Sequence, residues 1–240
     1  MKSKLSLVIL LTIASLTVFA QKPKVENLPL FKHKKVHFGF TLGINSAGYT
    51  LDRREIDFVT DSLLSIDVDN QSGFNLGIVS ALHFNEFFSL RFLPSLSFAQ
   101  RNVNYTFQKI NEGVVTTETL LKPIESTYIE LPLLFKYRSK RLNNFAAYIV
   151  GGGKYVIDLA SEEDVDNATQ DEPIVKTSSQ FIAAEIGVGT DFFLPYFKFS
   201  IEGKMSYGIS NILIRDNTIF SNPIERILPK MFILSLHFEG

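Results

Sequence analysis

Few side chains in this chain of 240 residues have the types and spacing needed for chemistry. The chain has no cysteine, which excludes disulfides, thiolate metal sites and cysteine nucleophiles. Three of its four histidines, His37, His83 and His237, fall on the polar phase of an alternating pattern. Together they could bind zinc or copper, or form a pH-sensitive contact. We favour a structural role in which the rings cap an interior, and we expect neither a resident metal nor a cofactor.

Two other motifs resemble ligand sites but lack a required residue. Gly151, Gly152 and Gly153 precede Lys154 as in a phosphate loop, but the spacing is wrong and Tyr155 follows. An acidic stretch lacks the sixth-position glycine of an EF-hand, which leaves calcium binding open; it contains Glu162, Glu163, Asp164, Asp166, Asp171 and Glu172. No pattern specifies catalytic residues, and we expect the protein not to be an enzyme.

Composition and the N-terminus narrow the class of protein. The 24 basic and 25 acidic residues nearly balance, which argues against a nucleic-acid partner. Lys2 and Lys4 precede an apolar run, and Val18 and Ala20 fit a cleavage site before Gln21, which predicts a signal peptide over residues 1–20. The run is shorter than the roughly 20 residues that a membrane-spanning helix needs. We expect residues 21–35 to form a periplasmic N-terminal segment and residues 36–240 a barrel.

The remaining chain alternates apolar and polar residues with a period of two, which predicts strands with one apolar and one polar face. Phe38, Phe40 and Leu42, for example, alternate with small or polar residues. Eight such segments lie near residues 36–45, 73–84, 88–101, 129–137, 145–156, 182–192, 197–207 and 232–238. Pro94 and Pro132 each remove a donor from the ladder, and we expect local bulges there.

The links between these segments alternate in length. Short links near 85–86, 138–144 and 194–196 alternate with long polar links near 52–71, 106–126, 157–178 and 210–226. This pattern is typical of outer-membrane barrels with short periplasmic turns. We therefore predict an all-β fold, an eight-stranded antiparallel up-and-down transmembrane β-barrel in the bacterial outer membrane with both mature termini periplasmic. A soluble barrel is the alternative, but the charged face would make a poor cup for an apolar ligand.

The polar face carries charges that we expect to pair inside the barrel. These structural lumen charges are Arg91, Glu130, Lys136, Glu185, Lys198, Glu202 and Lys204. Breaking one buried pair would leave the other charge uncompensated. The alternative is a water-filled interior in which each charge contributes little.

Four stretches, residues 36–51, 125–144, 148–161 and 186–213, resemble the PorT family. The resemblance implies a small outer-membrane barrel of Bacteroidetes needed by the type IX protein secretion system, and it supplies no catalytic residues. It implies other secretion-system subunits as partners, besides outer-membrane lipid. Because eight strands leave room only for side chains, we expect an accessory or assembly role and not a wide pore. An outer-membrane enzyme acting on lipid or surface protein, or a structural anchor, is the alternative; the partner, cargo and oligomeric state stay open.

Overall fold

The computed structural model describes residues 26–31, 34–54, 63–111, 114–161, 163, 165, 174–216, 218 and 220–240. The predicted signal peptide, residues 1–20, lies outside the described residues and stays a prediction. In the described part of the chain, no helix is both long and apolar enough to cross a membrane.

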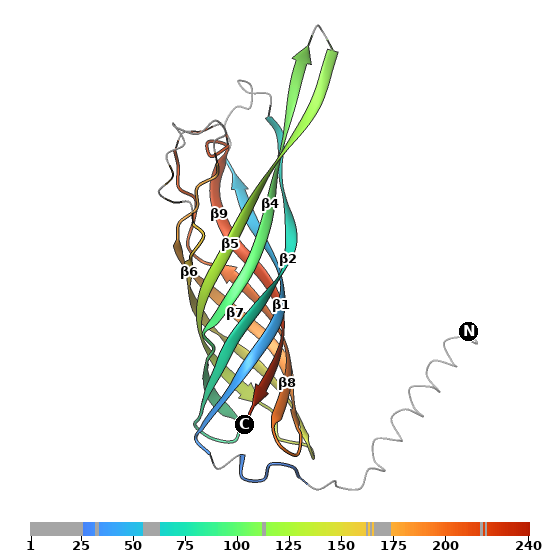
Figure 1. Ribbon diagram of the computed structural model, residues 1–240, viewed down its shortest axis with the longest axis vertical. Coiled ribbons are helices and arrows are strands. Elements are labelled where there is room, and N and C mark those ends of the chain that lie inside the picture. The colour runs from blue at the N-terminus through green and yellow to red at the C-terminus, as the bar shows by residue number, and fades with distance from the viewer. Residues whose placement is uncertain are drawn as a thin grey trace, which may run out of the picture.

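Nine antiparallel strands form one sheet that closes on itself (Figure 1). They are β1 (Val36–Arg53), β2 (Leu63–His83), β3 (Phe88–Phe92), β4 (Ser95–Asn111), β5 (Val114–Arg138), β6 (Phe145–Asp158), β7 (Gln180–Phe193), β8 (Lys198–Gly208) and β9 (Ile224–Glu239). The ring closes because β1 pairs with both β2 and β9. Strands β3 and β4 share one position in the ring, since each pairs with both β2 and β5. The predicted eight-stranded up-and-down barrel is therefore confirmed, with its third strand divided in two.

The division lies at Pro94, but it is not a bulge. Phe92 pairs with Leu133 and Ser95 with Glu130, so both strands advance by three residues across the gap. The N–H of Leu93 donates to the carbonyl oxygen of Pro132 at 3.2 Å. The bulges predicted at Pro94 and Pro132 are wrong because each proline only removes a donor, and the strands stay in step. The register of β2 and β4 shifts elsewhere, between Asn70 and Phe74 and between Leu63 and Ser65.

The two faces of the wall have opposite polarity, as the alternation predicts. Phe40, Ile186 and Phe135 point outward and are 52%, 69% and 62% exposed. Their inward neighbours Thr41 and Glu185 are buried. A closed barrel with an apolar outer wall and a polar interior is typical of barrels surrounded by lipid.

The two ends of the barrel differ. The short connections 84–87, 139–144 and 194–197 lie at one end, with the C-terminus, and we call it the turn end (Figure 1). The long connections lie at the other, the loop end. Two predicted links are largely strand: β2 already begins at Leu63, and β4 and β5 extend as a ribbon beyond the barrel (Figure 1). Aromatic and β-branched residues in these links, such as Phe107 and Val115, favour strands although the links as a whole are polar.

Candidate functional site in the barrel interior

The barrel interior holds equal numbers of buried basic and acidic side chains among the described residues. The six basic ones are Arg91, Arg101, Lys136, Lys154, Lys198 and Lys204, and the six acidic ones are Glu130, Asp158, Glu185, Asp191, Glu202 and Glu239. All seven side chains predicted to line the lumen are in this set. A balanced set allows each buried charge to lie near its opposite, which removes most of the cost of burial.

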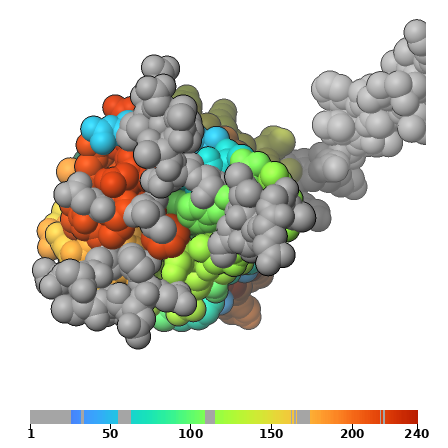
Figure 2. All heavy atoms as spheres, turned by 90° about the horizontal axis from the view of Figure 1, so that it is seen from above, coloured from blue at the N-terminus to red at the C-terminus, as the bar shows by residue number. Residues whose placement is uncertain are grey.

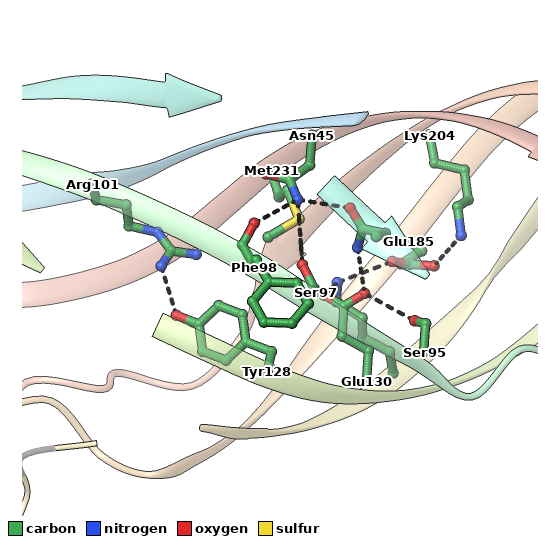
Figure 3. Close-up of polar contacts among 12 residues, drawn as sticks. Asn45, Ser95, Ser97, Phe98, Arg101, Tyr128, Glu130, Glu185, Lys204 and Met231 are labelled. Carbon is green, nitrogen blue, oxygen red and sulfur yellow. Dashed lines mark hydrogen bonds and ion pairs between the residues drawn. The ribbon is translucent and has the colours of Figure 1, made fainter. Parts of the chain in front are cut away.

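Six of these residues form a continuous chain of alternating charge across the middle of the lumen, which we call the polar belt. In order, they are Glu130, Lys154, Glu185, Lys204, Glu202 and Arg91. Lys154 Nζ lies 2.6 Å from Glu130 Oε1 and 3.2 Å from Glu185 Oε1. Lys204 Nζ lies 3.3 Å from Glu185 Oε2, a contact visible in Figure 3, and 3.8 Å from Glu202 Oε1. Arg91 then contacts Glu202 from the opposite wall.

Neutral side chains continue the polar belt around the rest of the ring. Asn75 donates to Glu130 Oε2 at 3.3 Å, and Asn45 donates to Asn75 Oδ1 at 2.7 Å (Figure 3 labels Asn45 and Glu130). His237 Nε2 lies 3.3 Å from Glu202 Oε1. These contacts connect β1, β2 and β9 to the charged residues of the other strands, so the polar belt ties together all sides of the barrel.

A second group of pairs lies between the polar belt and the turn end. Lys136 Nζ lies 2.8 Å from both carboxylate oxygens of Asp191, and the hydroxyl of Ser200 donates to Asp191 at 2.7 Å. Lys198 pairs with Glu239 at 2.8 Å. The predicted lumen residues Lys136 and Lys198 are thus paired as well, but outside the polar belt.

Apolar side chains fill the interior toward the loop end. Just beyond the polar belt, Arg101 Nη1 donates to the Tyr128 hydroxyl at 2.7 Å (Figure 3). The Arg101 guanidinium also lies 4.8 Å from the Tyr49 ring centre. Beyond it lies the loop-end cluster, whose fully or nearly fully buried members include Tyr105, Ile212, Phe220, Ile224 and Ile227. Seen from this end, the orange-red segment before β9 lies beside the green atoms of β4 and β5 (Figure 2).

The N-terminal segment closes the turn end. We call residues 26–31 the turn-end plug. Phe31 is 6% exposed, and its ring stacks on that of His37 at 3.6 Å between centroids. It also meets Phe193 edge to face at 5.8 Å. Asn27 anchors the plug, since its N–H donates to Asn144 Oδ1 at 2.8 Å and its side chain donates to the Phe193 carbonyl at 2.9 Å.

The structure brings together two of the three histidines singled out from the sequence. His37 and His83 lie edge to face, with centroids 4.8 Å apart, beside Phe31. His237 lies opposite Thr41, four residues farther along β1 from His37, and contacts Glu202 instead. Strand stagger places it at another level of the barrel. In the described residues, no cluster of three or more histidine, aspartate or glutamate side chains could hold a metal ion.

The predicted set of lumen charges omits five of the twelve charged residues of the interior: Arg101, Lys154, Asp158, Asp191 and Glu239. Lys154 follows three glycines that suggest a phosphate loop, but it shares the inward phase of Tyr148 and Val156. Glu239 shares the inward phase of His237. Extending the period-two pattern through the glycines of β6 and to the end of β9 would have found both.

The candidate calcium loop is described only in part. Of its six acidic residues, only Glu163 lies within the described residues. Its Oε2 accepts a hydrogen bond from the Ser179 N–H at 2.8 Å. Hydrogen bonds from Ser179 lower the pKa of the Glu163 carboxyl, which shows that this carboxylate already has a partner within the chain.

Several solved structures are similar to this chain at low sequence identity. OprG of Pseudomonas aeruginosa is 11% identical, with a TM-score of 0.43, and the alignment covers 85% of this chain and 91% of OprG. Ail of Yersinia pestis is 15% identical, with a TM-score of 0.38 and coverage of 86% and 100%. AlkL is 14% identical, with a TM-score of 0.38 and coverage of 92% and 94%. These values are too low to support any argument about function, and no curated protein sequence matches the chain.

A family model matches most of the chain. Residues 19–213 match the family model described as an outer membrane protein beta-barrel domain. This match spans most of the chain, from before β1 into the segment that precedes β9. Together with the closed barrel and its apolar outer wall, it shows that the chain belongs to the outer-membrane β-barrel domain family of bacterial outer-membrane proteins.

Proposed function

We propose that this protein is a non-enzymatic component needed for protein secretion by a type IX-like system, in which it serves as an accessory or assembly factor. The assignment to this secretion system is supported by a resemblance to the PorT family, which covers residues 36–51, 125–144, 148–161 and 186–213. The filled barrel interior supports an accessory or assembly role in that system, because a conduit for cargo would need an open lumen.

The observation that carries this proposal is the polar belt. An extended polypeptide crossing the barrel would have to separate Lys154 from Glu130 and Arg91 from Glu202. Breaking a buried pair costs about 3–5 kcal/mol. The loop-end cluster and the turn-end plug would also have to move. A barrel of this size holds its own side chains and little else.

We further propose that the turn end faces the periplasm and the loop end faces outward, since short turns are periplasmic in barrels of this kind. Other secretion-system subunits would then contact the loops or the turn end, and lipid would contact the apolar wall. Nucleic acid is not a partner in this proposal.

A deletion strain tests the secretion role. We expect secreted cargo to remain unprocessed in the cells, with unchanged lipid A, and the full-length gene to restore secretion. Normal secretion with altered lipid A would overturn the proposal in favour of an enzyme. Normal secretion with unchanged lipid A would overturn it in favour of a structural anchor.

Conductance in planar bilayers tests the claim that the barrel is not a conduit. We expect the purified protein to show no large, stable conductance. A variant that lacks residues 26–31 should behave the same, because the polar belt and the loop-end cluster remain in place. A reproducible channel in the nanosiemens range from the unaltered protein would overturn the assignment.

A further inference from the structure

The turn-end plug lies at the end of the barrel that faces water. Hydrogen bonds hold it in one conformation. Arg141 Nη2 donates to the Asn27 carbonyl at 2.5 Å and to Asn144 Oδ1 at 2.7 Å. Leu28 has a φ of 49°, a left-handed backbone conformation that a leucine rarely adopts. Strain of this kind persists only where surrounding contacts impose it, and it is concentrated at functional sites.

A hollow of about 190 Å³ opens beside the plug. Aromatic rings line its floor, since Phe31 and Phe193 are buried there and Phe87 borders it. Because Phe31 and Phe193 are buried inside the barrel mouth, the hollow lies at the turn end of the barrel.

Cationic side chains dominate the rim of the hollow and its surroundings. Arg138, Lys140 and Arg141 line it, together with Glu26 and Glu86, and the exposed Lys34 and Lys35 lie at the same end. Arg138 donates to the carbonyl oxygen of Glu86 and not to a carboxylate. Among the described residues, none of these five basic side chains has a carboxylate within 4.0 Å.

The guanidinium of Arg141 lies 3.9 Å from the ring centre of Phe193 and close to the guanidinium of Arg138. Partial burial lowers its pKa, and the positive charge of Arg138 acts in the same direction against the opposing effect of Glu26. An additional anion at this place would therefore be stabilised by at least two guanidinium groups.

The segments that flank the plug in the sequence are basic. The residues that precede the plug include Lys22 and Lys24, and those that follow it include Lys32 and Lys34. The acidic stretch near residues 162–172 follows β6, whose last residue, Asp158, is at the loop end. Among the described residues, the acidic side chains that line the hollow are Glu26 and Glu86, against three basic ones, so the hollow can accept a further anion from another molecule.

We infer that the turn end is a docking face for a partner protein, which inserts an acidic segment carrying a bulky apolar side chain. The acidic group meets Arg138, Lys140 and Arg141, and the apolar side chain covers the aromatic floor. A lipid phosphate could pair with the cations, but it has no apolar group that would cover the aromatic rings at the barrel mouth. This docking face deepens the proposed function and rests on its assignment of the turn end to the periplasm.

Crosslinking in living cells tests the inference. The photoreactive residue p-benzoylphenylalanine replaces Leu30, which is 70% exposed on the plug, and in a parallel strain it replaces Leu64 at the loop end. We expect a discrete protein adduct from position 30 only, mapped by mass spectrometry to a segment with Asp or Glu beside a large apolar residue. Lys140→Glu should lower the yield about ten-fold, since it places like charge at the contact. Arg54→Glu, the same charge change at the loop end, should leave the yield unchanged.

The mapped segment then serves as the probe in solution. A synthetic peptide of that sequence should bind the purified full-length protein, and a version with Asn and Gln in place of its acids should bind about ten-fold more weakly. A position-30 adduct with lipid alone, no adduct, or a yield insensitive to Lys140→Glu would each overturn the docking face. Normal secretion by the deletion strain would instead overturn the secretion role and leave the crosslinking result standing, so the two failures are distinguishable.

Discussion

The polar belt and the loop-end cluster fill the same barrel by opposite chemistry. The polar belt consists of buried charges whose stability depends on each having its partner, as Glu202 has Arg91 and Lys204. The loop-end cluster consists of apolar and aromatic side chains such as Ile227 and Phe220, whose stability depends on volume and shape. A substitution that leaves a charge of the polar belt without its partner should therefore cost more stability than one that leaves a small cavity in the loop-end cluster.

Glu202→Gln should have the largest effect. Glu202 is fully buried and contacts Arg91, Lys204 and His237. The amide leaves Arg91 without an anion, which should lower the free energy of unfolding by about 3–5 kcal/mol. The measurement is urea unfolding in detergent, together with the temperature at which heat-modifiable gel mobility is lost. Glu225→Gln, on the exposed surface at the start of β9, is the matched control and should change neither.

Glu185→Gln sharpens this prediction within the polar belt. Glu185 joins Lys154 to Lys204, but each lysine keeps a second anion, Glu130 and Glu202 respectively. We expect a smaller loss than for Glu202→Gln, about 3 kcal/mol, because no cation is left without a partner. Equal mobility transitions in both variants and in the unaltered protein would mean that water compensates the charges and that the lumen is wet.

Ile227→Ala measures the loop-end cluster by itself. Ile227 is fully buried, and its truncation should cost about 2–3 kcal/mol through lost transfer free energy and a residual cavity. Ile227→Val should cost about 1 kcal/mol, so the loss should follow the volume removed. A loss in Ile227→Val as large as in Ile227→Ala would contradict a cluster held by packing.

Asp52→Asn should have the smallest effect. Asp52 and Arg226 pair on the exposed surface, with side chains 40% and 51% exposed. Solvent and salt screen such a pair, so its loss should cost at most about 0.5 kcal/mol and should vanish at high salt. A cost comparable with that of Glu202→Gln would remove the distinction between the polar belt and surface pairs.

The period-two alternation was enough to assign the polar face of each strand. A period of two leaves no choice of side once the phase is known, and every predicted lumen charge from Arg91 to Lys204 is indeed buried. The same pattern and the link lengths were enough to predict the closed barrel. The alternation was less informative about where strands end. In the ribbon of β4 and β5, for example, β-branched residues stand in a polar link without a regular apolar–polar alternation.

Which inward side chains meet depends on the closed barrel and could not be predicted from the individual strands. Arg91 and Glu202 are 111 residues apart and lie on walls that do not pair with each other, and His237 lies on another level from His37 and His83. Partners across a lumen depend on strand stagger and on closure of the ring, which are properties of the whole sheet and not of any one strand. The turn-end plug could not be predicted from the sequence for the same reason. Phe31 lies outside the alternating segments, and its ring is buried only because the barrel closes around it.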